Sequence, residues 1–219
     1  MIRRRIAVTG VGLLVLAAAG CTGGGTTPGT PSPVPSSGAG SSSVAPDTSA
    51  PGQGLPYAGA PKVTTPFPES LFAGDPCADS MNPQQIDTAI GAPVKTKRAD
   101  EDRIGPGCDW LNTVTGGHVI MAYGVKLKDG LSAIYKNVQP SALKWEPLTL
   151  QGFPAVAYVG PSGGTPDRFC QISIGATDNT TIEVSMFLGD TTRGKKNPCD
   201  AANTVANLIM TSLREKAGN

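Results

Sequence analysis

The sequence contains few of the residues that enzymes use. It has one histidine, His118, and we identify no serine in a nucleophile elbow, the sharp strand-to-helix turn at which G-x-S-x-G enzymes place their nucleophile. The glycine-rich segment 160–164 lacks the lysine and the helix start of a phosphate-binding loop. Because a histidine base needs a nucleophile within hydrogen-bonding distance, we interpret His118 as an ordinary residue at the edge of a strand. We therefore predict no catalytic residues and no enzymatic activity.

Patterns that hold metal ions or cofactors are also missing. The cysteines are far apart in the sequence, whereas zinc sites use close pairs such as C-x2-C. The acidic segment Asp100-Glu101-Asp102 lacks the alternating oxygen ligands and the turn glycine of a calcium loop. We expect it to be a solvated loop between Arg98 and Arg103, and we predict neither a metal nor a cofactor.

Charge and hydropathy argue against two further classes of protein. Residues 1–20 contain three arginines and no acidic residue, so the rest of the chain keeps 15 of the 18 basic residues against 17 acidic ones. Its formal charge is then near −2, which does not provide the basic surface that nucleic-acid binding needs. The apolar run at residues 6–19 is shorter than the roughly 20 residues that span a bilayer. We expect no nucleic-acid partner and no membrane-spanning helix.

The apolar run has a different interpretation. Arginines at positions 3–5 precede it, and it ends in LAAAGC at residues 16–21. A cationic start, a short apolar core and small residues before a cleavage point are typical of a secretory signal peptide. A cysteine at that junction indicates a bacterial lipoprotein signal, in which residues 1–20 are removed and Cys21 carries acyl chains such as palmitate. We expect this anchor to hold the protein at the outer face of the cytoplasmic membrane, in the cell envelope.

A stretch rich in Ser, Thr, Gly and Pro follows the anchor over residues 21–66. It has no apolar periodicity, so it cannot bury enough surface to fold, and we predict a disordered tether. A flexible coil of about 45 residues spans roughly 35–40 Å. The chain is thus predicted to have a signal peptide at 1–20, a tether at 21–66 and a globular domain at 67–219.

Residue patterns in the domain predict an α+β fold. Asn82-Pro83-Gln84-Gln85 combines a capping residue, a first-turn proline and a glutamine at the third position, so it predicts a short helix that ends at Gly91. A second short helix is predicted over residues 131–138. Asn197-Pro198 opens a final amphipathic helix, whose stripe of Cys199, Ala202, Ala206, Ile209 and Leu213 should pack on a sheet.

Alternating apolar residues predict the strands of that sheet. A mostly antiparallel sheet of about six strands is expected, flanked by the short N-terminal helix and the C-terminal amphipathic helix. The strands are expected near residues 108–111, 118–125, 145–159 (a pair around Gln151-Gly152), 169–176 and 181–188.

Four cysteines remain once Cys21 is assigned to the lipid. In an exported protein an even number of cysteines indicates disulfides, rather than free thiols or metal ligands. Three pairings are possible for four cysteines. The layout favours Cys77–Cys108 and Cys170–Cys199, because each pair would then tie the start of a helix to a strand.

The order of these features resembles a known family. Asp75-Pro76-Cys77 precedes a helix, Cys108-Asp109-Trp110 begins a strand, and Pro198-Cys199 begins the last helix, all behind a lipoprotein signal and a tether. Over residues 70–216 this is similar to the actinobacterial secreted proteins grouped as domain of unknown function 3558. The resemblance implies an envelope lipoprotein without an assigned activity. The layout is also similar to the two-disulfide extracellular sensor domains of some actinobacterial receptor kinases.

Two features are candidates for a ligand-binding surface. Arg193, Lys195 and Lys196 form a basic loop before the last helix that could meet an anionic envelope polymer, although such a loop is most often only a charged turn. Trp145 could border a ligand groove, although packing in the core or at an edge is the common fate of a tryptophan. We expect Trp110 to pack beside the Cys77–Cys108 bridge.

These observations favour a lipid-anchored envelope protein that acts as a non-catalytic ligand-binding or protein-interaction module. Its expected partners are the membrane, through Cys21, and an envelope protein or a small ligand. An extracytoplasmic sensor domain that partners an envelope kinase is the alternative, which the similarity in layout suggests. A hydrolase that acts on wall or lipid is a third hypothesis, which location alone motivates.

Overall fold

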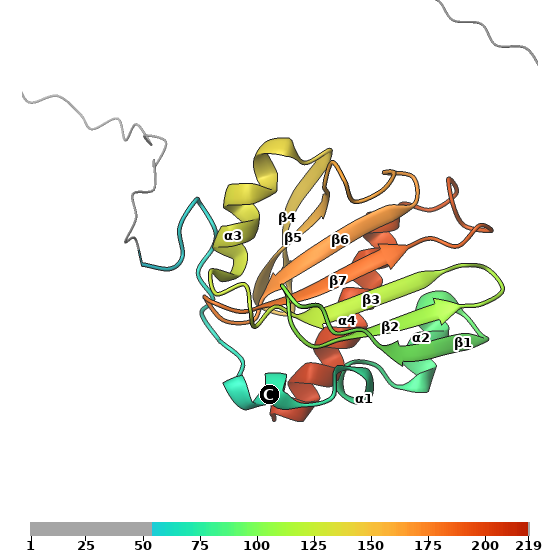
Figure 1. The fold of residues 1–219 in the computed structure, drawn as a ribbon, viewed down its shortest axis with the longest axis horizontal. Helices are drawn as coiled ribbons and strands as arrows, with labels where there is room; N and C mark the ends of the chain where they lie inside the picture. The colour runs from blue at the N-terminus through green and yellow to red at the C-terminus, as the bar shows by residue number, and fades with distance from the viewer. Residues whose placement is uncertain (1–53, 219) are drawn as a thin grey trace, which may run out of the picture. The chain divides into compact units, whose positions relative to one another are not determined.

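A seven-stranded antiparallel sheet forms the centre of the protein in a computed structural model that describes residues 54–218 (Figure 1). The strand order is β1-β2-β3-β7-β6-β5-β4, and every pair of neighbours is antiparallel. The strands are β1 (Val94–Arg98), β2 (Gly107–Asn112), β3 (His118–Tyr123), β4 (Lys144–Leu150), β5 (Phe153–Val159), β6 (Phe169–Gly175) and β7 (Thr181–Phe187).

The helices confirm the predicted fold class. They are α1 (Pro76–Ser80), α2 (Pro83–Ile90), α3 (Gly130–Asn137) and α4 (Pro198–Ala217), with short 3-10 turns η1 (Glu69–Ala73) and η2 (Gln139–Ser141). The signal peptide, Cys21 and most of the predicted tether lie outside the described residues. Among residues 54–218, none of the helices combines the length and the apolar character needed to cross a bilayer.

The strand that the sequence did not predict is β1, at one edge of the sheet. Its sequence is VKTKR, and four of its five residues are exposed, so it carries no alternation of apolar and polar residues. It forms because its backbone pairs with β2, from Val94 opposite Asn112 to Arg98 opposite Cys108. The sheet therefore has seven strands where about six were expected.

Helix α4 covers one face of the sheet, as its apolar stripe predicts. Asn197 caps it by accepting a hydrogen bond from the Cys199 N–H at 2.9 Å, and Pro198 occupies the first turn. The helix ends at Ala217 and is capped by Gly218, whose positive φ of 76° suits a residue without a side chain. The predicted stripe is buried against the sheet core: Cys199, Ala202, Ala206, Ile209 and Leu213.

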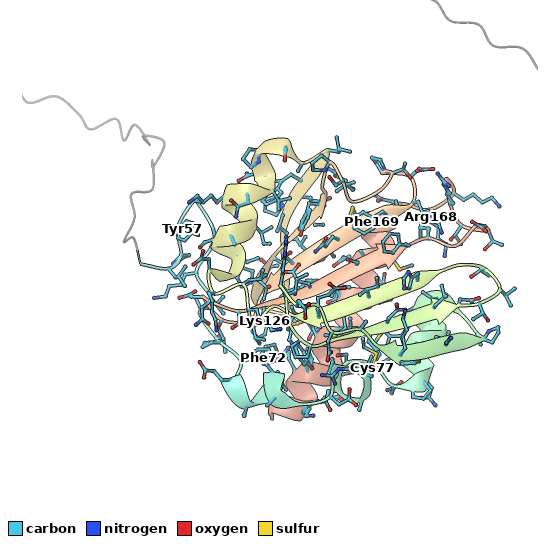
Figure 2. The ribbon with its side chains drawn as sticks, viewed as in Figure 1. Tyr57, Phe72, Cys77, Lys126, Arg168 and Phe169 are labelled. Carbon is cyan, nitrogen blue, oxygen red and sulfur yellow. A yellow bond between two sulfur atoms is a disulfide. The ribbon has the colours of Figure 1, made fainter. Side chains whose placement is uncertain are left out.

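The opposite face is covered over β5 and β6 by α3 and by residues 54–66, here called the strap. Tyr57 lies beside α3 (Figure 2), and its hydroxyl donates to Asp129 Oδ2 at 2.9 Å while its N–H donates to Ser132 Oγ at 2.9 Å. Farther along the strap, Ala60 and Val63 are buried. Contacts with the domain therefore begin before residue 67, where we expected the tether to end. The sequence did not predict these contacts because residues that form turns dominate this segment, and only a few of its side chains pack against the domain.

Both predicted disulfides are present. Cys77–Cys108 joins α1 to β2, and Cys170–Cys199 joins β6 to the first turn of α4; the Cα–Cα distance is 5.0 Å in each. Trp110 is fully buried in the same core as Cys108. Each disulfide thus ties a helix start to a strand, which is the arrangement on which the predicted pairing depended.

Candidate functional site

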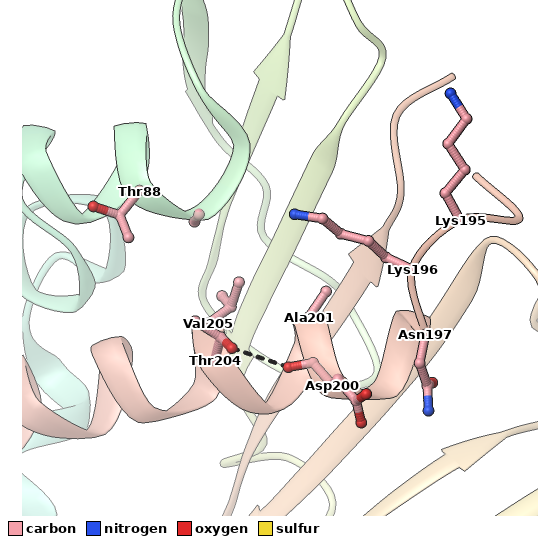
Figure 3. Close-up of a pocket in the computed structure, with 9 residues that line it drawn as sticks. Thr88, Lys195, Lys196, Asn197, Asp200, Ala201, Thr204 and Val205 are labelled. Atoms are coloured by element: carbon pink, nitrogen blue, oxygen red, sulfur yellow. Dashed lines mark hydrogen bonds between the residues drawn. The ribbon is translucent and has the colours of Figure 1, made fainter. Parts of the chain in front are cut away.

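A groove lies between the end of α2, the loop 188–197 and the first turns of α4 (Figure 3). Its volume is about 460 Å³, and a neighbouring hollow of about 220 Å³ continues it toward Thr115 and Leu188. The two share Thr88, Ala89, Lys196 and Ala201. The larger part is lined by Thr88, Ala89, Lys195, Lys196, Asn197, Asp200, Ala201, Thr204 and Val205.

The α2 wall of the groove is held in place by Gln85. The predicted capping box is present: Asn82 Oδ1 accepts from the Gln85 N–H at 2.9 Å, and Gln85 Oε1 accepts from the Asn82 N–H at 2.7 Å. The same side chain reaches α4, because its Nε2 donates to the Leu208 carbonyl at 3.3 Å and its Oε1 accepts from Ser212 Oγ at 3.0 Å. One glutamine therefore caps α2 and sets its position against α4.

The loop wall is fastened at several points. The Asp190 N–H donates to the Thr115 carbonyl at 2.8 Å, and Thr192 Oγ1 donates to the Gly189 carbonyl at 3.0 Å. A Cβ on Gly189 would lie 2.7 Å from the Thr115 carbonyl oxygen, so this close approach requires glycine. The Cys170–Cys199 bridge fixes the point where the loop enters α4.

The three basic residues predicted for a ligand surface have different roles in the structure. Arg193 Nε donates to Asp167 Oδ2 at 2.9 Å, and this hydrogen bond holds the pKa of Asp167 below its ordinary value. Lys195 and Lys196 instead line the groove, and neither forms an ion pair with any residue in the described range 54–218. The ammonium groups of Lys195 and Lys196 are thus available to a ligand, whereas the Arg193 guanidinium ties the loop to the 160–168 segment.

The other side of the groove presents hydrogen-bond acceptors. Thr88 Oγ1 donates its proton to the Gln84 carbonyl at 2.8 Å, and Thr204 Oγ1 donates to the Asp200 carbonyl at 3.0 Å. Because both hydroxyl protons are used within the helices, these oxygens can only accept from a ligand. The Asp200 carboxylate adds further acceptors. Ala89, Ala201 and Val205 contribute a small apolar surface between the two sides.

Trp145 does not share this surface. Its ring packs edge-on against Tyr135, with centroids 5.0 Å apart, and lies 5.9 Å from the ring of Tyr158. These residues belong to the apolar cluster under α3, and the indole Nε1 is buried. The structure therefore separates Trp145 from the basic loop with which the sequence prediction grouped it.

A second polar cluster joins three strands. No sequence pattern predicted that its members lie together. Asp109 on β2 lies 2.8 Å from His118 Nε2 on β3 and 3.3 Å from Lys97 Nζ on β1. His118 also stacks on Phe187, with centroids 5.5 Å apart. Within residues 54–218 no serine, threonine or cysteine side chain hydrogen-bonds to His118. The contacts tie β1, β2 and β3 together, and only the strand register brings them within reach.

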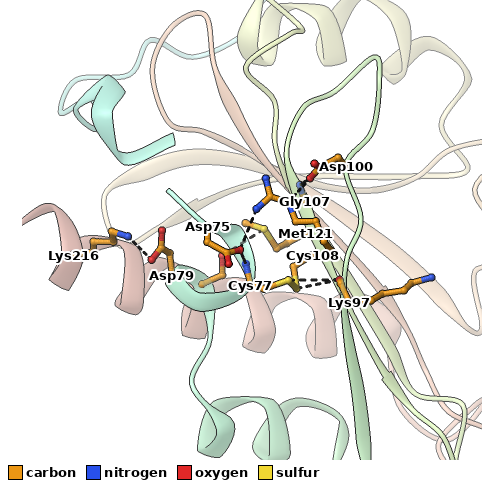
Figure 4. A network of polar contacts seen from close by, with 11 residues as sticks. Asp75, Cys77, Asp79, Lys97, Asp100, Gly107, Cys108, Met121 and Lys216 are labelled. Atoms are coloured by element: carbon orange, nitrogen blue, oxygen red, sulfur yellow. Dashed lines mark hydrogen bonds and ion pairs between the residues drawn. A yellow bond between two sulfur atoms is a disulfide. The ribbon is translucent and has the colours of Figure 1, made fainter. Parts of the chain in front are cut away.

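Around the Cys77–Cys108 bridge a further network joins α1 to the sheet and to α4 (Figure 4). Arg98 contacts Asp75 at 3.2 Å and Asp100 at 2.5 Å, and Lys216 of α4 pairs with Asp79. Asp100 also accepts a hydrogen bond from the Gly107 N–H at 3.1 Å. Its side chain is therefore held by Arg98 and Gly107, whereas we had predicted a solvated loop. The Arg98 hydrogen bond lowers the pKa of Asp100.

Comparison with known families supports the resemblance found in the sequence. A family model described as a protein of unknown function (DUF3558) matches residues 16–212. The chain belongs to this family. The match begins before Cys21 and extends into α4, so it includes the whole sheet, both disulfides and the groove of this DUF3558 protein. No curated protein matches the chain. Residues 54–218 also contain no group of three His, Cys, Asp or Glu side chains that could hold a metal ion.

Proposed function

We propose that this DUF3558 protein is a lipid-anchored protein at the outer face of an actinobacterial cytoplasmic membrane, and that its domain is a non-catalytic binding module. The observation that carries the proposal is the groove. Two lysines that form no ion pair within residues 54–218 line it together with threonine hydroxyls, a carboxylate and a small apolar surface, a set of groups that can orient a ligand. The disulfides suit an oxidising compartment outside the cytoplasm.

The anchoring part of the proposal rests on Cys21. The Cys21→Ala variant is expected to lose its palmitate label, because alanine has no thiol to receive the lipid. Labelling with radioactive palmitate measures this. Thr22→Ala keeps the acceptor cysteine and is the matched control, which should stay labelled and membrane-bound. Unchanged palmitate labelling of the Cys21→Ala variant would contradict the proposal.

The binding part is tested by filling the groove. Ala201 lines both parts of the groove, so Ala201→Trp should occlude it, whereas Ala78→Trp makes the same change at an exposed position on α1. Fractions of envelope extract that contain the ligand should raise the melting temperature of the wild type and of Ala78→Trp, since a ligand that binds only the folded state stabilises it. The same fractions should leave the melting temperature of Ala201→Trp unchanged. Equal shifts in all three proteins would place binding elsewhere and refute a binding groove.

A further inference from the structure

The two sides of the groove differ in hydrogen-bonding character, and that difference limits what can bind. Lys195 and Lys196 line the groove from the loop; Lys196 extends its ammonium group toward the end of α2, whereas Lys195 lies at the rim and extends away from both helices (Figure 3). The helices supply the Thr88 and Thr204 hydroxyl oxygens, whose protons are already bonded, together with the Asp200 carboxylate. A ligand that satisfies both sides needs an acceptor, best an anion, for the lysines and donors for the helices.

The charges also fix the orientation of such a ligand. Charge-assisted hydrogen bonds to an ammonium are stronger than neutral ones, so a phosphate or carboxylate group would lie at the loop. The Asp200 carboxylate disfavours a second anionic group on the helix side. Hydroxyl groups on the rest of the ligand would donate to Thr88, Thr204 and Asp200. Arg193 does not take part, because Asp167 already holds it.

Building on the binding module proposed above, we infer that the groove binds a hydroxylated anion: a sugar that carries one carboxylate or phosphate group. The small side chains of Ala89 and Ala201 leave the space for a ring, and the groove is open along its length toward Thr115. The same chemistry is offered by a free acidic sugar and by a unit of an anionic glycan.

Calorimetry on the lipidated protein in detergent tests this with four probes. Galacturonate carries both features, galactose has only the hydroxyl groups, acetate has only the anion, and polygalacturonate is the polymeric form. Galacturonate should bind at least about tenfold more tightly than galactose or acetate, as expected for loss of a charge-assisted hydrogen bond. Equal affinity for galactose and galacturonate, or no binding of galacturonate and polygalacturonate, overturns the inference. Tighter binding of polygalacturonate identifies a glycan as the source, and preference for galacturonate identifies the free sugar.

The lysines are tested in the same assay. Lys195→Ala/Lys196→Ala should weaken galacturonate binding by about tenfold or more. The control, Lys62→Ala/Lys95→Ala, removes the same charge from exposed residues outside the groove. It should change the affinity for galacturonate by less than about twofold, as expected for screened surface charges. Equal effects of the two variants overturn the inference. If galactose binds as tightly as galacturonate and Ala201→Trp abolishes both, the groove remains a binding site and only its selectivity for anions is refuted.

Discussion

Replacing Cys170 and Cys199 by serine should lower the free energy of unfolding by about 3–4 kcal/mol, the value expected in the chain-entropy model for a closed loop of this length. The bridge joins β6 to the first turn of α4, directly after the loop that carries Lys195 and Lys196. Without it, the loop 188–197 loses one of its attachments to the sheet. Urea denaturation gives the loss of stability, and hydrogen exchange of the peptide that contains the loop gives its local opening.

The second disulfide provides a matched control. Cys77–Cys108 closes a sequence separation of 31, against 29 for Cys170–Cys199, so its removal should cost a similar free energy. It lies at α1 and β2, away from the loop 188–197. Faster hydrogen exchange in that loop is therefore expected only for Cys170→Ser/Cys199→Ser under conditions where both variants are folded. Equal acceleration in the two variants would contradict a local role of the Cys170–Cys199 bridge in shaping the groove.

The second large effect is expected at Glu183, a carboxyl group that is 5% exposed in the middle of β7. Its oxygens accept hydrogen bonds from Ser173 Oγ at 2.5 Å, Thr181 Oγ1 at 2.6 Å and Gln171 Nε2 at 2.9 Å. Burial raises the pKa of Glu183, and this outweighs the hydrogen bonds, which lower it. The folded protein therefore binds the proton of Glu183 more tightly than the unfolded chain does.

This raised pKa makes stability depend on pH. The contribution of Glu183 is fully present below its unfolded pKa, near 4.5, and is lost as the pH rises through the higher folded pKa. Glu183→Gln cannot ionise, so the stability of this variant, measured as its free energy of unfolding, should rise relative to that of the wild type as the pH increases above about 4.5. Urea denaturation at a series of pH values measures the difference. The control is Glu215→Gln, at an exposed position on α4, whose free energy of unfolding should follow that of the wild type at every pH. If the curve for Glu183→Gln also ran parallel to that of the wild type, the prediction would be refuted.

Local signals explain why much of the fold could be predicted. The helix starts at Asn82 and Asn197 depend on a cap and a proline within a few residues, and both caps form. Alternating apolar residues predicted β3, β6 and β7 because side chains on a strand point to opposite faces in turn. The disulfide pairing followed from the same layout, since each bridge connects elements that were already placed.

Pairing between distant segments explains what was missed. Strand β1 has no pattern of its own and exists only as the partner of β2. The strap is rich in glycine and proline. It becomes part of the domain through contacts such as the hydrogen bond from the Val63 N–H to Asp178, which are 115 positions apart. Trp145 carries no signal that separates a buried ring from a ligand-facing one; the packing of α3 on β5 decides it.

By itself, the sequence determined the elements that depend on near neighbours: the α+β class, the capped helices, the alternating strands and a basic segment at residues 193–196. Only the tertiary structure decided that Arg193 is held by Asp167, and that Lys195 and Lys196 line one groove with residues of α2 and α4. The groove exists because Gln85 joins α2 to Leu208 of α4, across 123 positions. Contacts over such separations depend on how the whole chain packs, and no local pattern of residues encodes them.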